Sequence, residues 1–184
     1  MKKVLLLIVS TFICGLFGIF FGFRIFINIL FPDEKLSLQR EDYVGNELRI
    51  DDGYYHCYFD NSDITAIIFF FRNGIVKSGG SYSQFFEDNK EIQMVSFYNK
   101  FSPKSNWGVF IVNGNTLQYE RWIGSSSSQP MVYLIRKTGS ILNDTTIHFT
   151  EEYWSERKET SQINEVWHFK QFSPKPDSTN AYIK

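Results

Sequence analysis

Three histidines, His56, His148 and His168, are the side chains best suited to metal chemistry in this sequence. Neutral imidazole is a common zinc ligand, and in a closed eight-stranded barrel the three strands that carry them would be neighbours. Strand alternation argues against convergence, because His148 lies between the apolar Ile147 and Phe149. It shares its face with a polar set, namely Thr146, Thr150 and Glu152. We therefore expect His148 and His168 to point to solvent, and we predict no metal site and no cofactor.

Carboxylates and serines are the other candidates for catalysis. Four aspartates gather around the predicted first strand, at Asp51, Asp52, Asp60 and Asp63. Turns favour aspartate at such positions, so we interpret them as turn residues rather than as paired catalytic acids. Residues 125–128 are a serine run without a placed base, and the sequence holds no hydrolase, zinc-protease or phosphate-loop motif. We predict that the protein is not an enzyme.

The clearest positioning element is a hairpin around Asn113-Gly114. This dipeptide separates two runs in which apolar and polar residues alternate, and it tolerates the positive φ angles of a tight type I′ turn. A two-residue loop pairs Phe110 with Leu117, whereas a three-residue loop slips the pairing. We favour the two-residue loop, and in either case Leu117 and Tyr119 face inward.

About eight short strands follow one another after residue 46, with a turn expected at Thr138-Gly139 and a turn or bulge at Asn143-Asp144. The predicted ranges are 47–60 with an interruption at Asp52-Gly53, two strands around an Asn73-Gly74 turn within 64–80, then 107–112, 116–123, 131–136, 145–154 and 164–172. Eight sequentially paired strands close a small barrel and remove exposed edges. We predict a mainly β fold, an antiparallel up-and-down eight-stranded barrel. A sandwich or an open, strongly curved sheet is the alternative.

One helix is predicted near residues 83–101, where apolar side chains recur at helical spacing. The strand segment 66–71 reads AIIFFF and is apolar on both faces, whereas a barrel strand normally alternates. Its outer face therefore needs a cover. We assign that role to the inserted helix.

Residues 4–23 carry no charge and are long enough to cross a bilayer core of about 30 Å. A cleaved signal peptide turns polar near its cleavage site, but Phe20, Phe21 and Phe23 stand there. A lipoprotein signal around Cys14 is disfavoured because Ile13 precedes it. We predict an uncleaved N-terminal transmembrane helix that binds the membrane through residues 4–23, with cleaved or lipidated forms as the alternatives.

The charge pattern around this helix predicts its orientation. Lys2 and Lys3 favour a cytoplasmic N-terminus, which leaves the rest of the chain outside the cytoplasm. The predicted organisation is a transmembrane anchor at 1–31, a linker at 32–46, a barrel domain at 47–172 and a polar tail at 173–184.

Composition excludes one class of partner. The net charge is −1 and residues 1–31 contribute three positive charges, so the remainder carries −4. Nucleic-acid binders need clustered cations, and we predict no nucleic-acid partner. Cys57 is the single cysteine outside the apolar N-terminal run, so the outer domain forms no internal disulfide.

Three stretches, LRIDDGYYHCY, VNGNTLQY and ILNDTTIHF, resemble lipocalin-like (calycin-type) β-barrels of bacterial membrane-anchored envelope proteins. The resemblance spans residues 47–172, with the helix after the third strand as an elaboration. It implies a barrel that encloses a small apolar ligand, a place in the bacterial cell envelope and no catalytic residues.

Two functions fit this reading. One is a membrane-anchored module that binds a small apolar ligand in the barrel mouth. The alternative is a non-catalytic envelope interaction or structural module whose interior is filled by its own side chains; the aromatic content of 18% favours such filling. No protein partner is named by the sequence. The residues that we expect to face inward, and to contact a ligand if there is one, are Tyr55, Phe110, Leu117, Tyr119, Phe149, Trp167 and Phe169.

Overall fold

The computed structural model describes residues 34–58, 64–82, 103–124 and 132–184. The predicted anchor at 1–31 and the predicted helix near 83–101 lie outside the described residues. Among the residues that are described, no helix is long and apolar enough to cross a membrane. The one helical element in these ranges is a single 3₁₀ turn, η1 (Lys104–Asn106).

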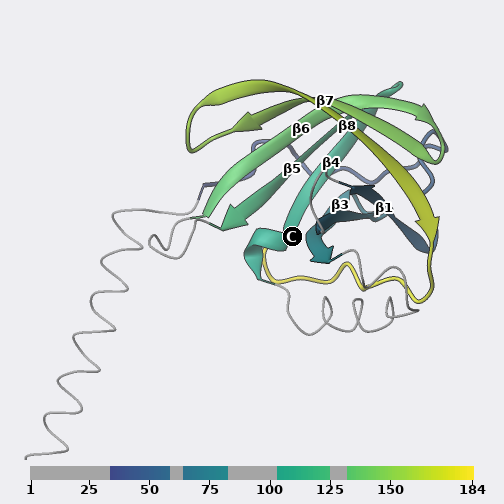
Figure 1. Ribbon diagram of the computed structural model, residues 1–184. Helices are drawn as coiled ribbons and strands as arrows, with labels where there is room; N and C mark the ends of the chain where they lie inside the picture. Colours follow the sequence, from purple (N-terminus) through teal and green to yellow (C-terminus); the bar gives the residue numbers. More distant parts are fainter. Residues whose placement is uncertain (1–33, 59–63, 83–102, 125–131) are drawn as a thin grey trace, which may run out of the picture. The chain divides into compact units, whose positions relative to one another are not determined.

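Eight antiparallel strands form a closed barrel in which each strand pairs with its neighbours in the sequence (Figure 1). They are β1 (Gly53–Tyr58), β2 (Ile64–Phe70), β3 (Ile75–Tyr82), β4 (Trp107–Asn113), β5 (Thr116–Gly124), β6 (Val132–Asn143), β7 (Thr146–Trp154) and β8 (Glu159–Gln171). Pairing of β1 with β8 closes the ring, with His56 opposite His168. The prediction of a mainly β, eight-stranded antiparallel barrel is confirmed.

The pairing between neighbouring strands of the barrel is shortest between β3 and β4. These strands share only three residue pairs, from Ile75 opposite Val109 to Lys77 opposite Trp107. β3 continues to Tyr82 in register with β2, whereas β4 begins at Trp107 and η1 precedes it. Among the described residues, the last five residues of β3 therefore have no partner strand on the β4 side.

The β4–β5 hairpin corrects the predicted pairing. Phe110 lies opposite Tyr119, and Val112 lies opposite Leu117, so the predicted Phe110–Leu117 pair is wrong. The two loop residues are Gly114 and Asn115, and Gly114 alone of the two has a positive φ, +57°. This pattern is that of a type II′ turn, not type I′. The inward faces were still predicted correctly, because the register differs by two residues and side chains alternate with a period of two.

Three further predictions about strand boundaries are wrong. The first strand was predicted at 47–60, but β1 begins at Gly53 and residues 47–52 form no strand. β6 does not turn at Thr138-Gly139 but runs through a bulge there to Asn143. A Cβ atom at Gly139 would lie 2.2 Å from the His148 carbonyl oxygen, so glycine lets the neighbouring strand approach at the bulge. β8 begins at Glu159 rather than at 164. The turn predicted at Asn143-Asp144 is confirmed, since it joins β6 to β7.

Apolar side chains gather on both sides of the barrel wall. The interior cluster holds aromatic residues from most strands in edge-to-face contact: Phe70 and Phe110 lie 4.9 Å apart between ring centroids, and Tyr119 and Phe149 5.3 Å apart. The outer cluster lies on the other face of β2 and its neighbours. It is composed of Tyr54, Ile67, Phe69, Phe71, Ile75, Trp107, Trp122, Leu134 and Phe172.

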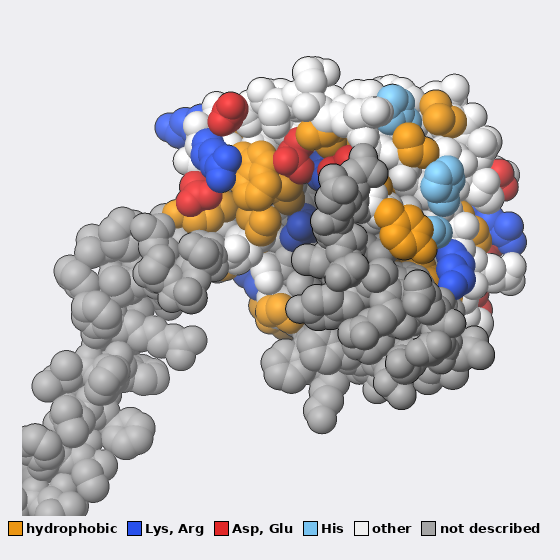
Figure 2. Space-filling model, viewed as in Figure 1, with side chains coloured by type: hydrophobic (Ala, Val, Ile, Leu, Met, Phe, Trp, Pro, Cys, Tyr) orange, Lys and Arg blue, Asp and Glu red, His pale blue; other side chains and the backbone are white. Residues whose placement is uncertain are grey.

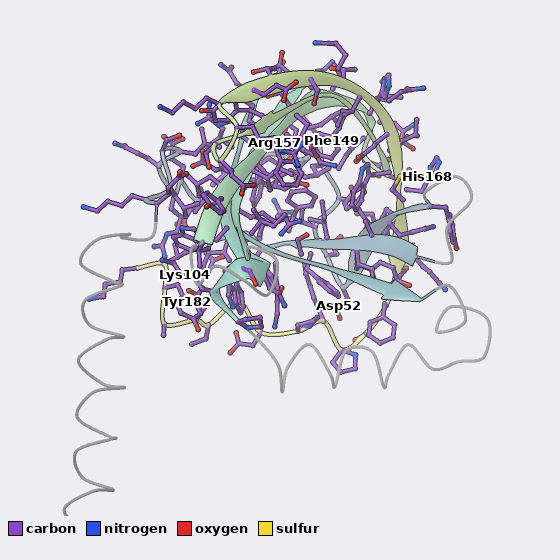
Figure 3. The ribbon with its side chains drawn as sticks, turned by 60° about the vertical axis from the view of Figure 1, so that its left-hand side comes forward. Asp52, Lys104, Phe149, Arg157, His168 and Tyr182 are labelled. Atoms are coloured by element: carbon purple, nitrogen blue, oxygen red, sulfur yellow. The ribbon has the colours of Figure 1, made fainter. Side chains whose placement is uncertain are left out.

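The outer cluster confirms that the segment 66–71 is buried on both faces. Part of the cover comes from the C-terminal tail, for which no packing was predicted. The tail leaves β8 and runs beneath β1–β3 towards η1 (Figure 1), and Ile183 packs against the outer cluster. Lys175 lies over the Phe71 ring at 4.7 Å and donates a hydrogen bond to the Ile50 carbonyl oxygen at 2.9 Å. Tyr182 lies beside Lys104 of η1 in Figure 3.

The segment that precedes β1 also packs on the barrel. Tyr43, Leu48 and Ile50 belong to the interior cluster and cover one end of the barrel. On the outer face, Glu120 is only 1% exposed and accepts hydrogen bonds from the Ser37 and Leu38 amides. Part of the predicted 32–46 linker is thus bound to the barrel, while the domain boundaries themselves stay predictions.

Candidate ligand pocket

A pocket of about 500 Å³ opens into the barrel at the end where β3 and β4 separate. Its described lining combines serine, asparagine, aromatic and charged side chains from β2, β3, η1 and β5–β8. In Figure 2, acidic and basic side chains lie next to large hydrophobic ones on the face presented. The lining residues used below are Tyr119, Arg121, Ile123, Lys137, Glu152, Trp154, Glu165 and Trp167.

The inward-facing side chains of β5 form one row that begins in the packed half of the barrel and continues into the pocket. On β5, Leu117 belongs to the interior cluster, Tyr119 belongs to both regions, and Arg121 and Ile123 line the pocket. Since side chains on one strand face alternate with period two, the row that fills one half of the barrel also lines the other half.

A bulge in β7 reverses this alternation. Gly139 of β6 lies opposite Phe149, but Thr138 lies opposite Glu151, so Thr150 is an extra residue in the β6–β7 ladder. Before Thr150 the inward-facing residues of β7 have odd numbers, such as Ile147 and Phe149; after it they have even numbers, and Glu152 and Trp154 line the pocket. The prediction that Glu152 shares the solvent face with His148 is therefore wrong.

An ion-pair triad lies at the inner part of the pocket. The Lys137 ammonium contacts both carboxylate oxygens of Glu165, at 2.6 and 2.7 Å, and one oxygen of Glu152 at 3.1 Å. The Lys137 side chain is 8% exposed and each glutamate 15%. Two indoles fix the carboxylates: Trp167 donates to Glu165 at 3.0 Å, and Trp154 donates to Glu152.

The triad determines the protonation of the pocket. Burial alone would lower the pKa of Lys137, but Tyr119, Glu165 and Glu152 outweigh it, and the pKa is raised. Burial raises the pKa of the Tyr119 hydroxyl, while the positive charges of Lys137 and Arg121 act in the opposite direction. At neutral pH, Lys137 is charged and Tyr119 is neutral.

Arg121 is the fourth charged side chain of the pocket lining. Its Nη1 donates to the carbonyl oxygens of Ser105 and Trp122, at 3.1 and 3.2 Å. Its Nε is shielded from solvent and has no hydrogen-bond partner among the described residues. A buried donor without a partner is costly, so the hydrogen-bonding capacity of the Arg121 guanidinium is only partly used among the described residues.

All seven predicted site residues lie in the barrel interior, but only two of them line the pocket. Tyr119 and Trp167 do so. Phe169 is partly buried against the interior cluster. The other four residues belong to that cluster: Tyr55, Phe110, Leu117 and Phe149, the last of which is labelled in Figure 3. A role of any of the seven in binding stays a prediction.

Sequence reasoning missed the charged part of the lining. Arg121 and Glu165 continue the inward rows of Leu117–Tyr119 and of Trp167–Phe169, so alternation carried a signal for both. Lys137 lay between the predicted strand 131–136 and the turn expected at Thr138-Gly139, so no face was predicted for it. Glu152 lies beyond the bulge at Thr150, and no local sequence motif predicts that bulge.

The three histidines lie on the outer face of β1, β7 and β8. Figure 2 shows histidine side chains gathered on one face, and Figure 3 shows His168 away from the interior. His148 Nε2 lies 2.7 Å from the Asn164 amide oxygen, and the His56 and His168 ring centroids lie 6.4 Å apart. The outward orientation of His148 and His168 is confirmed. Within the described ranges, no three His, Cys, Asp or Glu side chains gather closely enough to hold a metal ion.

Comparison with known proteins adds no relative: no protein-family model matches the chain, and neither a curated protein nor a solved structure matches it.

Proposed function

We propose that this protein is a lipocalin-like binding module that holds a small molecule in the pocket between the β3–β4 opening and the ion-pair triad. The single observation that carries the proposal is the pocket itself. Its volume of about 500 Å³ falls within the range of about 300–1,000 Å³ that is typical of small-molecule sites. Trp154, Trp167 and Ile123 supply apolar surface for the body of such a ligand.

The alternative, an interaction or structural module with a filled barrel, is supported by the other half of the molecule. There the interior cluster packs Phe70, Phe110 and Phe149 in edge-to-face contact, and Tyr43 and Leu48 cover the barrel end. This half supplies stability rather than space. We favour binding because the filling stops at Tyr119 and Trp167, beyond which the pocket begins.

We propose a non-catalytic role for the pocket. Lys137 is held between two carboxylates with a raised pKa, so it is a poor base and a poor nucleophile at neutral pH. Each carboxylate in turn accepts from an indole and from Lys137. These hydrogen bonds and ion pairs hold the charged side chains in fixed positions, which suits binding of a ligand rather than proton transfer.

We further propose that residues 4–23 anchor the protein in the membrane as a single-pass helix, with the barrel outside the cytoplasm of a bacterial cell. The support is sequence alone: an uncharged run long enough to span a bilayer, preceded by Lys2 and Lys3. Retention of the full-length protein in the membrane fraction after carbonate washing is the expected result. An N-terminus found beyond residue 14 by sequencing would contradict it.

The pocket is tested with the full-length chain in dodecyl maltoside and the fluorescent probe anilinonaphthalene sulfonate. We expect probe fluorescence above that of empty micelles, and its loss in Ile123→Trp and Ser105→Trp, which both place a bulky ring in the pocket. Val166→Trp is the control, because Val166 is 39% exposed on the outer face of β8. Equal probe binding by all three variants, with unchanged melting temperatures, would leave the interaction-module alternative.

A further inference from the structure

We propose that the ligand of this pocket is a small zwitterion, with its ammonium group at the carboxylates of Glu152 and Glu165 and its anionic group at the guanidinium of Arg121. This inference rests on the proposed function, because it names the ligand class of the same pocket.

The inner end of the pocket has an excess of negative charge. Glu152 and Glu165 share the single ammonium of Lys137, which leaves the triad with one negative charge in excess. Both carboxylates remain 15% exposed, so they are not sealed off by the protein. A second ammonium group beside them would balance the triad.

Aromatic rings surround the same carboxylates. The indole nitrogens of Trp154 and Trp167 are fixed by Glu152 and Glu165, so the rings stand next to the negative charges and line the pocket. Indole is the aromatic ring that attracts cations most strongly. Carboxylates and indoles together form a surface suited to a primary or quaternary ammonium group.

Arg121 provides the opposite charge within the same pocket. Nη1 is bound to two backbone carbonyls, which hold the guanidinium in place without neutralising it. The guanidinium lines the pocket, and a guanidinium binds carboxylate or phosphate by paired hydrogen bonds. Ser105 and Asn106 line the pocket beside it.

The two ends together select against simpler ligands. A purely apolar molecule would remove water from four charged side chains and return no polar contact to Arg121 or to the triad. A simple anion would satisfy Arg121 but would meet the negative triad, and a simple cation would do the reverse. A zwitterion matches both ends, and the four side chains have no net charge.

The test measures calorimetric binding of phosphocholine, choline and inorganic phosphate to the full-length chain in dodecyl maltoside. We expect phosphocholine to bind at least about tenfold more tightly than choline or phosphate, each of which carries charge of one sign only. Arg121→Gln should weaken phosphocholine and leave choline unchanged, whereas Glu152→Gln should weaken phosphocholine and choline together. Arg40→Gln is the matched control, because Arg40 is exposed outside the pocket lining.

Choline binding by Arg121→Gln also reports that this variant is folded. Dihexanoyl phosphatidylcholine below its micelle concentration distinguishes the two sources of the same headgroup chemistry: tighter binding than phosphocholine assigns a lipid headgroup, and equal or weaker binding assigns a free metabolite. Phosphate and phosphocholine binding with equal affinity, both lost in Arg121→Gln, would overturn the zwitterion in favour of a plain anion. Binding of anilinonaphthalene sulfonate without any phosphocholine binding would overturn the zwitterion while leaving the proposed function standing.

Discussion

A single buried carboxylate on the outside of the barrel joins parts of the chain that are far apart in sequence. Glu120 of β5 accepts from the amides of Ser37 and Leu38, and Arg136 of the next strand binds the same carboxylate at 2.8 Å. Hydrogen bonds to a charged group are stronger than those between neutral groups. Glu120 therefore determines where the segment before β1 lies on the barrel.

Replacing this carboxylate should destabilise the barrel strongly. Glu120→Ala leaves two backbone donors and the Arg136 guanidinium without their acceptor, and we expect a loss of about 3 kcal/mol in unfolding free energy. Urea unfolding followed by tryptophan fluorescence measures it. Glu159→Ala is the control, since Glu159 is exposed at the start of β8; equal losses in the two variants would contradict the role of Glu120.

At the scale of the elements, one bulge in the β6–β7 ladder shapes the barrel. Its extra residue, Thr150 of β7, turns Glu152 and Trp154 inward, and Gly139 on the opposite strand lets β6 and β7 approach each other. A Cβ atom at Gly139 would lie 2.6 Å from the Phe149 Cα atom as well as close to the His148 carbonyl. Backbone atoms cannot move aside as a flexible side chain can.

A methyl group at Gly139 should accordingly destabilise the sheet. We expect Gly139→Ala to lower the unfolding free energy by about 2 kcal/mol, the range of small-to-large substitutions at packed positions. Gly124→Ala is the matched control, because its Cβ would meet Ser105 at an ordinary contact distance of 3.8 Å. A Gly139→Ala variant as stable as Gly124→Ala would show that the bulge adjusts without cost.

The C-terminal tail covers part of the outer cluster, and two buried lysines, Lys175 of the tail and Lys77 of β3, make the stability of the protein sensitive to pH. Burial lowers the pKa of Lys77 to about 8, and burial lowers the pKa of Lys175 to about 8. The unfolded value is 10.5 for both, so between these pH values the unfolded chain binds more protons than the folded one. Stability should therefore increase as the pH rises above about 8, and it is lower at pH 7.

Urea unfolding at a series of pH values from about 7 to about 9, roughly one pH unit on either side of the shifted pKa, tests this linkage. We expect the midpoint to rise over this window, and Lys175→Met to reduce the rise by about half, because Lys77 still contributes. Lys184→Met, at an exposed position, should follow the unaltered protein. A midpoint that falls steadily over this window would contradict the expected direction.

At the scale of the whole molecule, the described chain has two apolar cores on the two sides of one sheet. The interior cluster is closed by the strands and by Tyr43 and Leu48, whereas the outer cluster depends on Phe172 and Ile183. The barrel and the segments that flank it are therefore a single packing unit.

Truncation after Phe172 should separate these contributions. Removing residues 173–184 takes Lys175 away from the Phe71 ring and Ile183 away from the outer cluster while leaving every strand intact. We therefore expect a lower melting temperature and increased self-association in size-exclusion chromatography. Truncation should also remove the contribution of Lys175 to the pH dependence of the free energy of unfolding. A truncated chain with the original melting temperature and elution would show that the tail adds no stability.

Much of this architecture was accessible from local sequence patterns. Glycine turns and alternating runs predicted eight strands in order, and the inward faces of Leu117 and Tyr119 held even where the pairing register differed. The remaining errors have non-local causes. A bulge at Thr150 reverses the face of Glu152, and Glu120 binds Ser37, which lies 83 residues earlier in the sequence. The tail packs through isolated residues such as Lys175 that produce no periodicity.

Closure of the ring by β1 and β8 has a consequence for biosynthesis. β1 can pair with β8 only after the chain has been synthesised as far as His168, the partner of His56 about 110 residues later. At typical translation rates this delay is roughly ten seconds. During this interval one edge of β1 has no partner strand from its own chain, and free strand edges pair readily with other chains. Nascent copies made close together on one message therefore face a risk of pairing with each other, and a chaperone that shields a β edge would act on this protein before its last strand is synthesised.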